Sequence, residues 1–202
     1  MTRPKISVVL PFVDRIDPVE ELLRGYSRVL EECDLSYEMI AVIDGGATQA
    51  IDPVLELQRT IPTIRVLKLA KYFGESTALQ AGLDHASGHR VLTLPPYHQI
   101  EPDELRLLVE EIESCDMVVC HRTPRKGSSF ERIRRRVFHF LVRVLSGEKY
   151  RDLGCGVRLM TAQAASEMTL YGDLHRFMPI LASRAGFVVH EIDVRQSPLD
   201  EY

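Results

Sequence analysis

Short apolar runs alternate with longer amphipathic stretches through the first half of the chain. The runs are rich in Val and Ile and are bounded by Gly, Pro or Asp, as buried strands are. They predict strands at Ile6–Leu10, Met39–Ile43, Ile64–Leu69, Val91–Leu94, Met117–Cys120 and Phe187–Val194. The amphipathic stretches, with apolar residues at helical spacing, predict helices at Pro18–Cys33, Ser76–Ser87, Pro102–Ser114 and Phe130–Leu145. This alternation predicts an α/β fold in which helices flank a mainly parallel central sheet.

The expected strands end in segments that carry polar and charged side chains. In open parallel sheets, ligands bind beyond the carboxyl ends of the strands. These ends are Pro11–Arg15, Asp44–Thr48, Ala70–Gly74, Pro95–Gln99 and His121–Lys126. We therefore expect a ligand site at this edge of a single domain that spans residues 1–202.

The charge of the chain is small overall but uneven along its length. The formal net charge is -4, so the chain lacks the basic excess of a nucleic-acid-binding domain, and no nucleic-acid partner is expected. Arginines gather between residues 122 and 143, and the helix expected at Phe130–Leu145 combines them with large apolar side chains. This pattern is typical of a helix that lies on an anionic membrane surface. A core helix with a charged outer face has the same pattern, so both interpretations stay open.

The cysteines and the apolar runs predict the cellular location of the protein. The four cysteines form no Cys-x-x-Cys pair and have no histidine at zinc spacing, so they are expected to be reduced core residues of a cytoplasmic protein. No run approaches the roughly 18 apolar residues of a membrane-spanning helix. We expect a cytoplasmic protein, or one that is peripheral at the cytoplasmic face of the membrane.

Five segments, in order along nearly the whole chain, resemble the family 2 glycosyltransferases. They are Ser7–Pro11, Val42–Thr48, Tyr72–Ala86, Asp152–Arg158 and Tyr171–Pro179. The likeness is to the branch that moves a sugar from a nucleotide to dolichyl or polyprenyl phosphate. The resemblance implies a GT-A fold, which is a Rossmann-like domain that binds a nucleotide sugar, and a lipid phosphate as partner. It also implies a membrane-proximal part after this domain, which the sequence does not include.

The resemblance assigns roles to residues at the expected strand ends and in the later motifs. The resemblance assigns nucleotide contacts to Pro11, Asp44, Gly74 and Gln99. It assigns phosphate contacts to Arg122, Arg125 and Arg158, and it makes Asp152 the candidate general base. The residues themselves leave alternatives open. Asp44 could cap the turn that follows it, and Asp152 could orient the Gly154–Gly156 loop. Arg158 could pair with Asp152, and Arg122 could belong to a solvated run of charges.

The chain departs from the family where the family holds its metal. Pro95 and Tyr97 stand where the resemblance predicts an Asp-x-Asp, and Gly45 replaces the acidic neighbour of Asp44. Magnesium and manganese need oxygen ligands, commonly carboxylates. Proline offers none, and a tyrosine phenol with a pKa of about 10 is neutral at pH 7. His98 is expected to face solvent, so neither a metal site nor a metal cofactor is predicted.

Two functions follow from this combination of motifs and departures. The first is a glycosyltransferase that acts from a nucleotide sugar on a polyprenyl or dolichyl phosphate, with an altered or metal-independent diphosphate site. The second is a catalytically inactive relative that serves as a binding or regulatory partner. The sequence leaves open which of these holds, and it equally leaves open a homo-oligomer.

Overall fold

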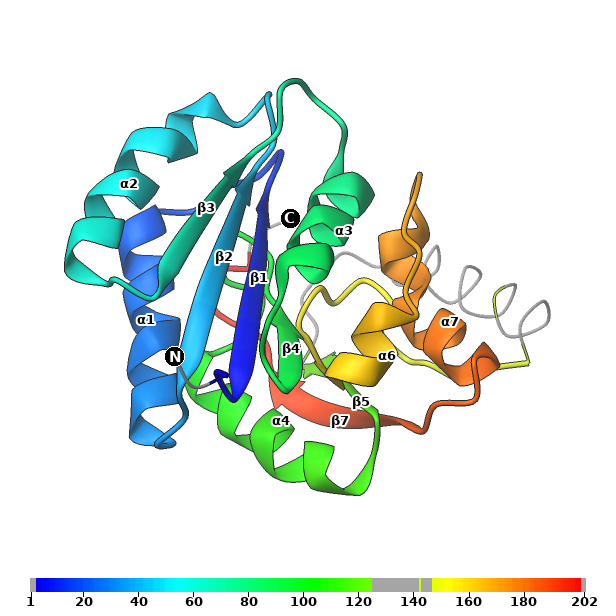
Figure 1. The fold of residues 1–202 in the computed structure, drawn as a ribbon. Coiled ribbons are helices and arrows are strands. Elements are labelled where there is room, and N and C mark those ends of the chain that lie inside the picture. The colour runs from blue at the N-terminus through cyan, green and yellow to red at the C-terminus, as the bar shows by residue number, and fades with distance from the viewer. Residues whose placement is uncertain (1–2, 125–141, 143–146, 201–202) are drawn as a thin grey trace.

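A computed structural model of the chain describes residues 3–124, 142 and 147–200, and its centre is a seven-stranded sheet (Figure 1). The strands are β1 (Ile6–Phe12), β2 (Tyr37–Ile43), β3 (Ile64–Lys68), β4 (Arg90–Thr93), β5 (Met117–Thr123), β6 (Arg158–Thr161) and β7 (Val189–Arg195). Their order across the sheet is β3-β2-β1-β4-β6-β5-β7. Every neighbouring pair is parallel except those of β6, which runs antiparallel to β4 and β5.

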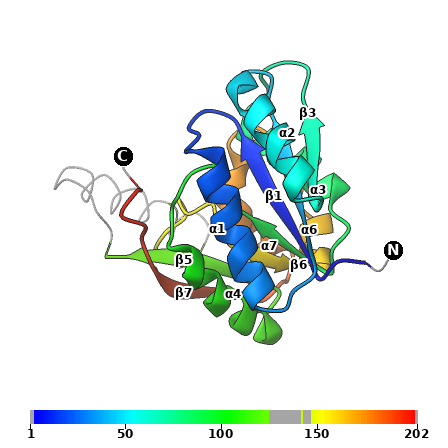
Figure 2. The same ribbon diagram turned by 90° about the vertical axis from the view of Figure 1, so that its left-hand side faces the viewer.

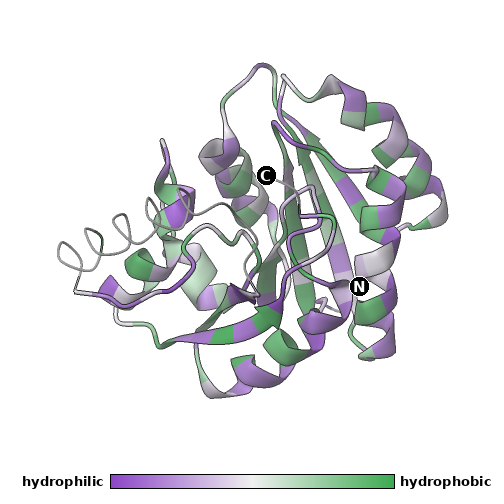
Figure 3. Cartoon of the chain, turned by 180° about the vertical axis from the view of Figure 1, so that it is seen from behind, coloured by the Kyte–Doolittle hydropathy of each residue, from purple (hydrophilic) through white to green (hydrophobic). Residues whose placement is uncertain are grey.

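Helices cover both faces of this sheet (Figures 1 and 2). They are α1 (Val19–Glu32), α2 (Ile51–Thr60), α3 (Glu75–His85), α4 (Leu105–Glu111), α6 (Ala162–Ser166) and α7 (Met178–Arg184). One core packs α1, α2 and α4 on the sheet, and a second core packs α3, α6 and α7 on the opposite face. Val8 and Leu10 of β1 point into the first core and Val9 into the second. Because β1 is buried on both faces, every residue of it except Ser7 is apolar. In Figure 3, green apolar strands lie between mixed helices.

The predicted α/β architecture is confirmed, but the pattern missed one antiparallel strand and three helices. β6, α2, α6 and α7 were not expected. β6 has only four residues and begins with an arginine, so it carries no apolar run. The helix expected at Pro102–Ser114 is an α-helix over Leu105–Glu111 with a 3-10 turn at each end. Apart from Val142, the helix expected at Phe130–Leu145 lies outside the described residues. Within the described residues, no helix combines the length and the apolar character that a membrane crossing requires.

A buried glutamate joins the amino-terminal ends of three strands. Glu38 of β2 accepts hydrogen bonds from Ser7 Oγ of β1 at 2.6 Å, from Ser87 Oγ at 2.6 Å and from Arg65 Nη1 of β3 at 2.6 Å. Burial raises the pKa of Glu38, but these hydrogen bonds outweigh it and lower the pKa to about 2. The ionised carboxylate therefore stabilises the folded state.

Glu38→Gln is expected to lower the free energy of unfolding at neutral pH by roughly 2 kcal/mol. Because the pKa of Glu38 falls on folding, its contribution is present above the ordinary value of 4.5 and is lost as the pH falls towards about 2. Urea unfolding at about pH 7, 5 and 3 should therefore show a steeper acid loss in the wild-type protein than in the variant. Glu110→Gln, at an exposed position of α4, is the matched control. Equal pH slopes in Glu38→Gln and the wild-type protein would contradict this assignment.

Candidate functional site

A pocket of about 480 Å³ opens beyond the carboxyl ends of β1, β4 and β5. This volume is in the range of small-molecule sites. Its lining includes Pro11, Val13, Asp14, Arg15, Glu75, Pro96, Tyr97, Gln99, Arg122, Leu153, Gly154, Gly156, Arg158, His175, Arg176 and Asp200. The structure thus brings together four of the predicted site residues, which are Pro11, Gln99, Arg122 and Arg158. The pocket lies at the edge of the sheet where the sequence analysis expects a ligand site.

Gln99 ties the turn after β4 to the loop that precedes β6. Its amide nitrogen donates to Tyr97 Oη at 2.9 Å and to the Gly154 carbonyl at 3.4 Å. Its amide oxygen accepts from the Gly156 nitrogen at 2.7 Å. Burial raises the pKa of Tyr97 to about 12, so its phenol stays neutral. The Arg15 guanidinium lies 4.4 Å from the centre of the Tyr97 ring, a cation–π contact at the pocket wall.

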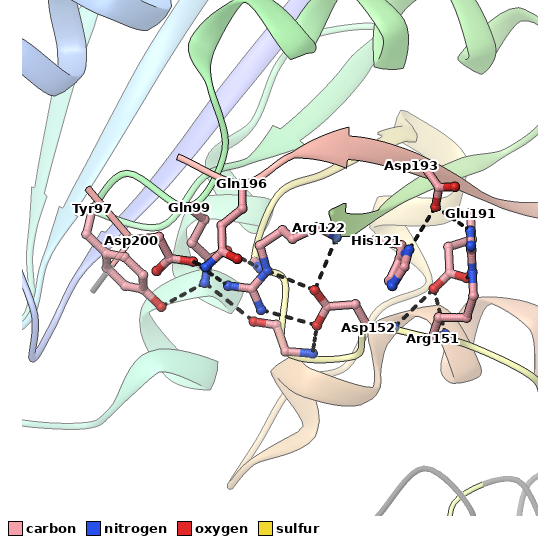
Figure 4. A network of polar contacts seen from close by, with 12 residues as sticks. Tyr97, Gln99, His121, Arg122, Arg151, Asp152, Glu191, Asp193, Gln196 and Asp200 are labelled. Atoms are coloured by element: carbon pink, nitrogen blue, oxygen red, sulfur yellow. Dashed lines mark hydrogen bonds and ion pairs between the residues drawn. The ribbon is translucent and has the colours of Figure 1, made fainter. Parts of the chain in front are cut away.

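A buried arginine at the end of β5 is held by two carboxylates (Figure 4). Arg122 Nε and Nη2 donate to the Asp152 carboxylate at 2.8 and 3.1 Å, in the two-pronged geometry of strong arginine–carboxylate pairs. Its Nη1 donates to Asp200 Oδ2 at 3.0 Å. Arg122 is only 2% exposed, so the alternative that placed it in a solvated run of charges is wrong.

The Asp152 carboxylate accepts hydrogen bonds from Arg122 and from the backbone of its own loop. Its side chain is 0% exposed, and besides Arg122 its carboxylate accepts from the Gly154 nitrogen at 3.1 Å. This geometry favours the alternative in which Asp152 orients the Gly154–Gly156 loop. Asp152 is not among the residues that line the pocket, although Leu153 and Gly154 are. Its role as a general base stays a prediction.

Arg158, the first residue of β6, lines the pocket and forms no ion pair with a carboxylate among the described residues. It is 2% exposed, and its side chain donates to Met178 Sδ at 3.5 Å. Within the described residues no carboxylate lies at ion-pair distance from it, and the expected alternative, a pair with Asp152, is not formed because Arg122 takes that carboxylate. Burial lowers the pKa of Arg158. Arg176 also lines the pocket and donates to His175 Nε2 at 3.4 Å.

Two of the predicted nucleotide contacts lie in a backbone turn instead of at the pocket wall. Asp44, at the end of β2, is 0% exposed. Its carboxylate accepts from the backbone nitrogens of Gly45 at 2.9 Å, Phe73 at 3.0 Å and Gly74 at 2.9 Å. Gly74 has φ of +85°, a conformation suited to glycine, and precedes α3. The structure favours the turn-capping alternative for Asp44, and contact with a nucleotide base stays a prediction for both residues.

The sequence of the chain matches a known protein family over most of its length. The model of glycosyl transferase family 2 matches residues 7–168. The chain belongs to this family. Among similar proteins is the undecaprenyl-phosphate 4-deoxy-4-formamido-L-arabinose transferase of Edwardsiella ictaluri, 29% identical over 194 residues, which cover 95% of this chain and 60% of the relative. The dodecaprenyl-phosphate galacturonate synthase of Rhizobium johnstonii is 26% identical over 209 residues, which cover 98% of this chain and 62% of the relative.

Solved structures agree on the fold of this family 2 chain. Glucosyl-3-phosphoglycerate synthase from Mycobacterium tuberculosis, in complex with Mn2+, uridine diphosphate and glucosyl-3-phosphoglycerate, superposes with a TM-score of 0.70 at 16% identity. The match covers 98% of this chain and 73% of that one. The fold is thus GT-A, as the resemblance implied. The chain spans about 60% of the length of the curated relatives it matches.

The residues of this family 2 chain do not fit the divalent metal that the fold implies. In the turn after β4, Pro95 and Pro96 have no ligand atom in their side chains, and the neutral Tyr97 phenol accepts from Gln99. The amide oxygen of Gln99 accepts from Gly156. His98 was expected to face solvent, which is wrong, because it is 5% exposed and its Nδ1 lies 3.1 Å from Asp17 Oδ2. Across the part of the chain that the structure describes, no group of three or more His, Cys, Asp or Glu is placed to hold a metal ion.

Gly45 is required by the close approach of two backbone segments. A Cβ added at Gly45 would lie 2.4 Å from Lys71 Cα and 2.5 Å from its carbonyl carbon. Gly45→Asp, which would restore the family's acidic pair, is therefore expected to destabilise the chain by roughly 3 kcal/mol or to prevent folding. Thermal unfolding measures this, with Gln49→Asp at an exposed position of the same segment as control. A variant as stable as the control would contradict the packing argument.

The pocket residues to which the sequence analysis assigned no role include Arg15, His175, Arg176 and Asp200. Arg15 belongs to a strand-end segment, which is a signal that could have found it. His175 and Arg176 lie in a motif that carried the resemblance, where burial lowers the pKa of His175 and its Nδ1 lies 2.9 Å from Ser76 Oγ. Asp200 had no signal, because only the folded chain brings it beside Arg122. Arg125, the remaining predicted phosphate contact, lies outside the described residues.

Proposed function

We propose that this chain is the donor-binding and catalytic domain of an enzyme that transfers a sugar from a nucleotide sugar to a polyprenyl phosphate. Two relatives at 26–29% identity bear the names of enzymes for such lipid phosphates. The alternative of a catalytically inactive relative finds no support among them, because both are named for a transfer or synthesis reaction.

The observation that carries the proposal is the buried guanidinium of Arg158 at the pocket. A buried charge without a charged partner costs several kcal/mol. A diphosphate in the pocket would place an anion beside Arg158, for which the described residues supply no ion pair, and it would accept hydrogen bonds from Arg158 and Arg176, which both line the pocket. Fixed cations at a departing diphosphate also stabilise the charge that develops there during transfer.

The other residues then have defined parts in the reaction. Pro11 and Gln99 line the pocket and would contact the nucleotide, while Asp44 and Gly74 would shape the turn beside it. Asp152 would act as a positioning residue, because it holds Arg122 and the Gly154 backbone. The acceptor is a lipid, so the basic segment expected at Phe130–Leu145 would bring the domain to the cytoplasmic face of an anionic membrane. Co-sedimentation with anionic and neutral vesicles tests that contact.

A binding and transfer assay tests the proposed function. Isothermal titration with a panel of uridine and guanosine diphosphate sugars should show binding at or below about 1 mM, the upper end of common KM values. Incubation of the bound sugar nucleotide, radiolabelled in the sugar, with undecaprenyl phosphate in detergent should give a labelled lipid. Absence of binding across the panel, with and without magnesium or manganese, would overturn the proposal.

A further inference from the structure

The carboxylate of Asp200 lies between two arginines at the pocket. Its Oδ2 accepts from Arg122 Nη1 at 3.0 Å, and its Oδ1 lies 3.5 Å from Arg15 Nη1. Arg15 Nη2 also donates to the Leu199 carbonyl at 3.0 Å, and Gln196 donates to Asp200 Oδ2 at 2.8 Å. Asp200 is only 3% exposed, and all three charged residues line the pocket. Figure 4 shows Asp200 beside Arg122, with Tyr97 and Gln99 next to it.

This arrangement recognises the oxygens of an anion. The guanidiniums come from the carboxyl ends of β1 and β5, and other groups hold both in place. Arg122 is fixed by Asp152, and Arg15 is fixed over the Tyr97 ring with Asp17 at 3.5 Å. Guanidinium groups bind carboxylate and phosphate oxygens with the same donor geometry. The positions that hold the Asp200 oxygens can therefore hold the oxygens of a phosphoryl group.

The same two arginines oppose a divalent cation. Their charges are permanent, and Arg15 covers the face of Tyr97, the residue that stands where a metal carboxylate was expected. A cation placed beside them would meet both guanidiniums and the neutral phenol of Tyr97, while the carboxylates of Asp17, Asp152 and Asp200 there are already in ion pairs with these arginines. Arg15 and Arg122 would therefore neutralise the charge of a bound phosphate themselves.

We infer that Arg15 and Arg122 form a phosphate subsite, that the Asp200 carboxylate is its internal occupant, and that a phosphate binds there by displacing Asp200 without a divalent cation. The inference rests on the proposed function only for its natural ligand, the diphosphate of a nucleotide sugar. Because Asp152 still holds Arg122 when Asp200 leaves, the subsite keeps its shape during the exchange. Asp200 then sets the affinity of the pocket, because each ligand has to compete with it.

Titration of inorganic pyrophosphate and uridine diphosphate in the presence of EDTA tests this subsite. Asp200→Asn removes the competing charge but keeps an oxygen for Gln196, so it should tighten pyrophosphate binding about fivefold or more. Arg15→Gln should weaken it about fivefold or more. Glu20→Gln and Arg24→Gln, the two halves of an exposed pair on α1, change the same charges away from the pocket and should leave affinity unchanged. Circular dichroism of each variant establishes that it is folded.

The outcomes separate this inference from the proposed function. Unchanged or weaker pyrophosphate binding in folded Asp200→Asn would overturn the subsite, even where nucleotide sugars bind the wild-type chain. Binding that appears only when magnesium or manganese replaces EDTA would overturn it as well. If the two variants shift pyrophosphate affinity in opposite directions while no nucleotide sugar binds, the subsite stands and the proposed function fails. Should Asp200→Asn be unfolded, loss of affinity in Arg15→Gln supports the subsite and unchanged affinity overturns it.

Discussion

Replacement of Arg158 by methionine is expected to weaken nucleotide-sugar binding about 100-fold while it leaves the stability of the domain unchanged or higher. The loss of affinity follows from the loss of a buried cation that we propose to contact the diphosphate, worth about 3 kcal/mol for a charge-assisted hydrogen bond. The stability should not fall, because Arg158 is buried without a carboxylate partner in the described structure. An apolar side chain of similar length avoids the desolvation of that charge.

Calorimetric titration and urea unfolding of the same samples measure both parts of this prediction. Arg24→Met, which removes an arginine from an exposed pair with Glu20, is the matched control and should change neither quantity by much. Arg158→Lys should recover part of the affinity, because it restores the charge without the planar fork. A methionine variant that is much less stable than the wild type would show that Arg158 serves the fold more than the ligand.

Asp152→Ala is expected to lower the free energy of unfolding by about 3–5 kcal/mol. The variant leaves the buried Arg122 guanidinium without its two-pronged partner and removes the acceptor of the Gly154 nitrogen. The loop from Gly154 to Gly156 should become more mobile. The pocket wall that this loop forms with Gln99 should become more mobile as well. The main effect is therefore on the fold, and the loss of ligand affinity follows from it.

Chemical unfolding of Asp152→Ala and Asp152→Asn separates positioning from general-base catalysis. Asparagine keeps one accepting oxygen, so it should lose less stability than alanine if Asp152 serves the cluster. Asp103→Asn, in an exposed pair with Arg28, is the control and should change stability by less than about 1 kcal/mol. If both Asp152 variants keep wild-type stability and nucleotide-sugar affinity yet abolish transfer to the lipid, Asp152 acts as the base and our reading of its geometry is wrong.

The local pattern of apolar residues was sufficient to predict the strands that are buried on both faces. β1 lies between β2 and β4 with a core on each face, so almost every residue is apolar and the strand is visible without partners. β6 was missed because Arg158 opens it and only three residues follow. Its place in the sheet comes from antiparallel pairing with β4 and β5, far away in the sequence. No periodicity in a single segment contains that information.

The residues of the candidate site also fall into two groups: those that the sequence located and those that only the structure located. The strand-end segments contain Pro11, Gln99 and Arg122, which line the pocket because the carboxyl ends of parallel strands meet at one edge of a sheet. The turn around Asp44 could not be distinguished from a ligand contact, since both use a carboxylate at that position, and only the backbone donors of Phe73 and Gly74 separate them. His98 was wrongly expected at the surface, because its partner Asp17 is far from it along the chain.

By itself, the sequence determined the α/β class of this chain, the edge of the sheet that carries the pocket, and a site with poor metal ligands, because each depends on residue types and on short-range order. Only the tertiary structure decided which charges meet. It paired Arg122 with Asp152 and Asp200, left Arg158 without a carboxylate among the described residues, and stacked Arg15 on Tyr97. The physical reason is distance: ion pairing and burial depend on separation in space, and these residues come from strand ends and loops that are far apart along the chain.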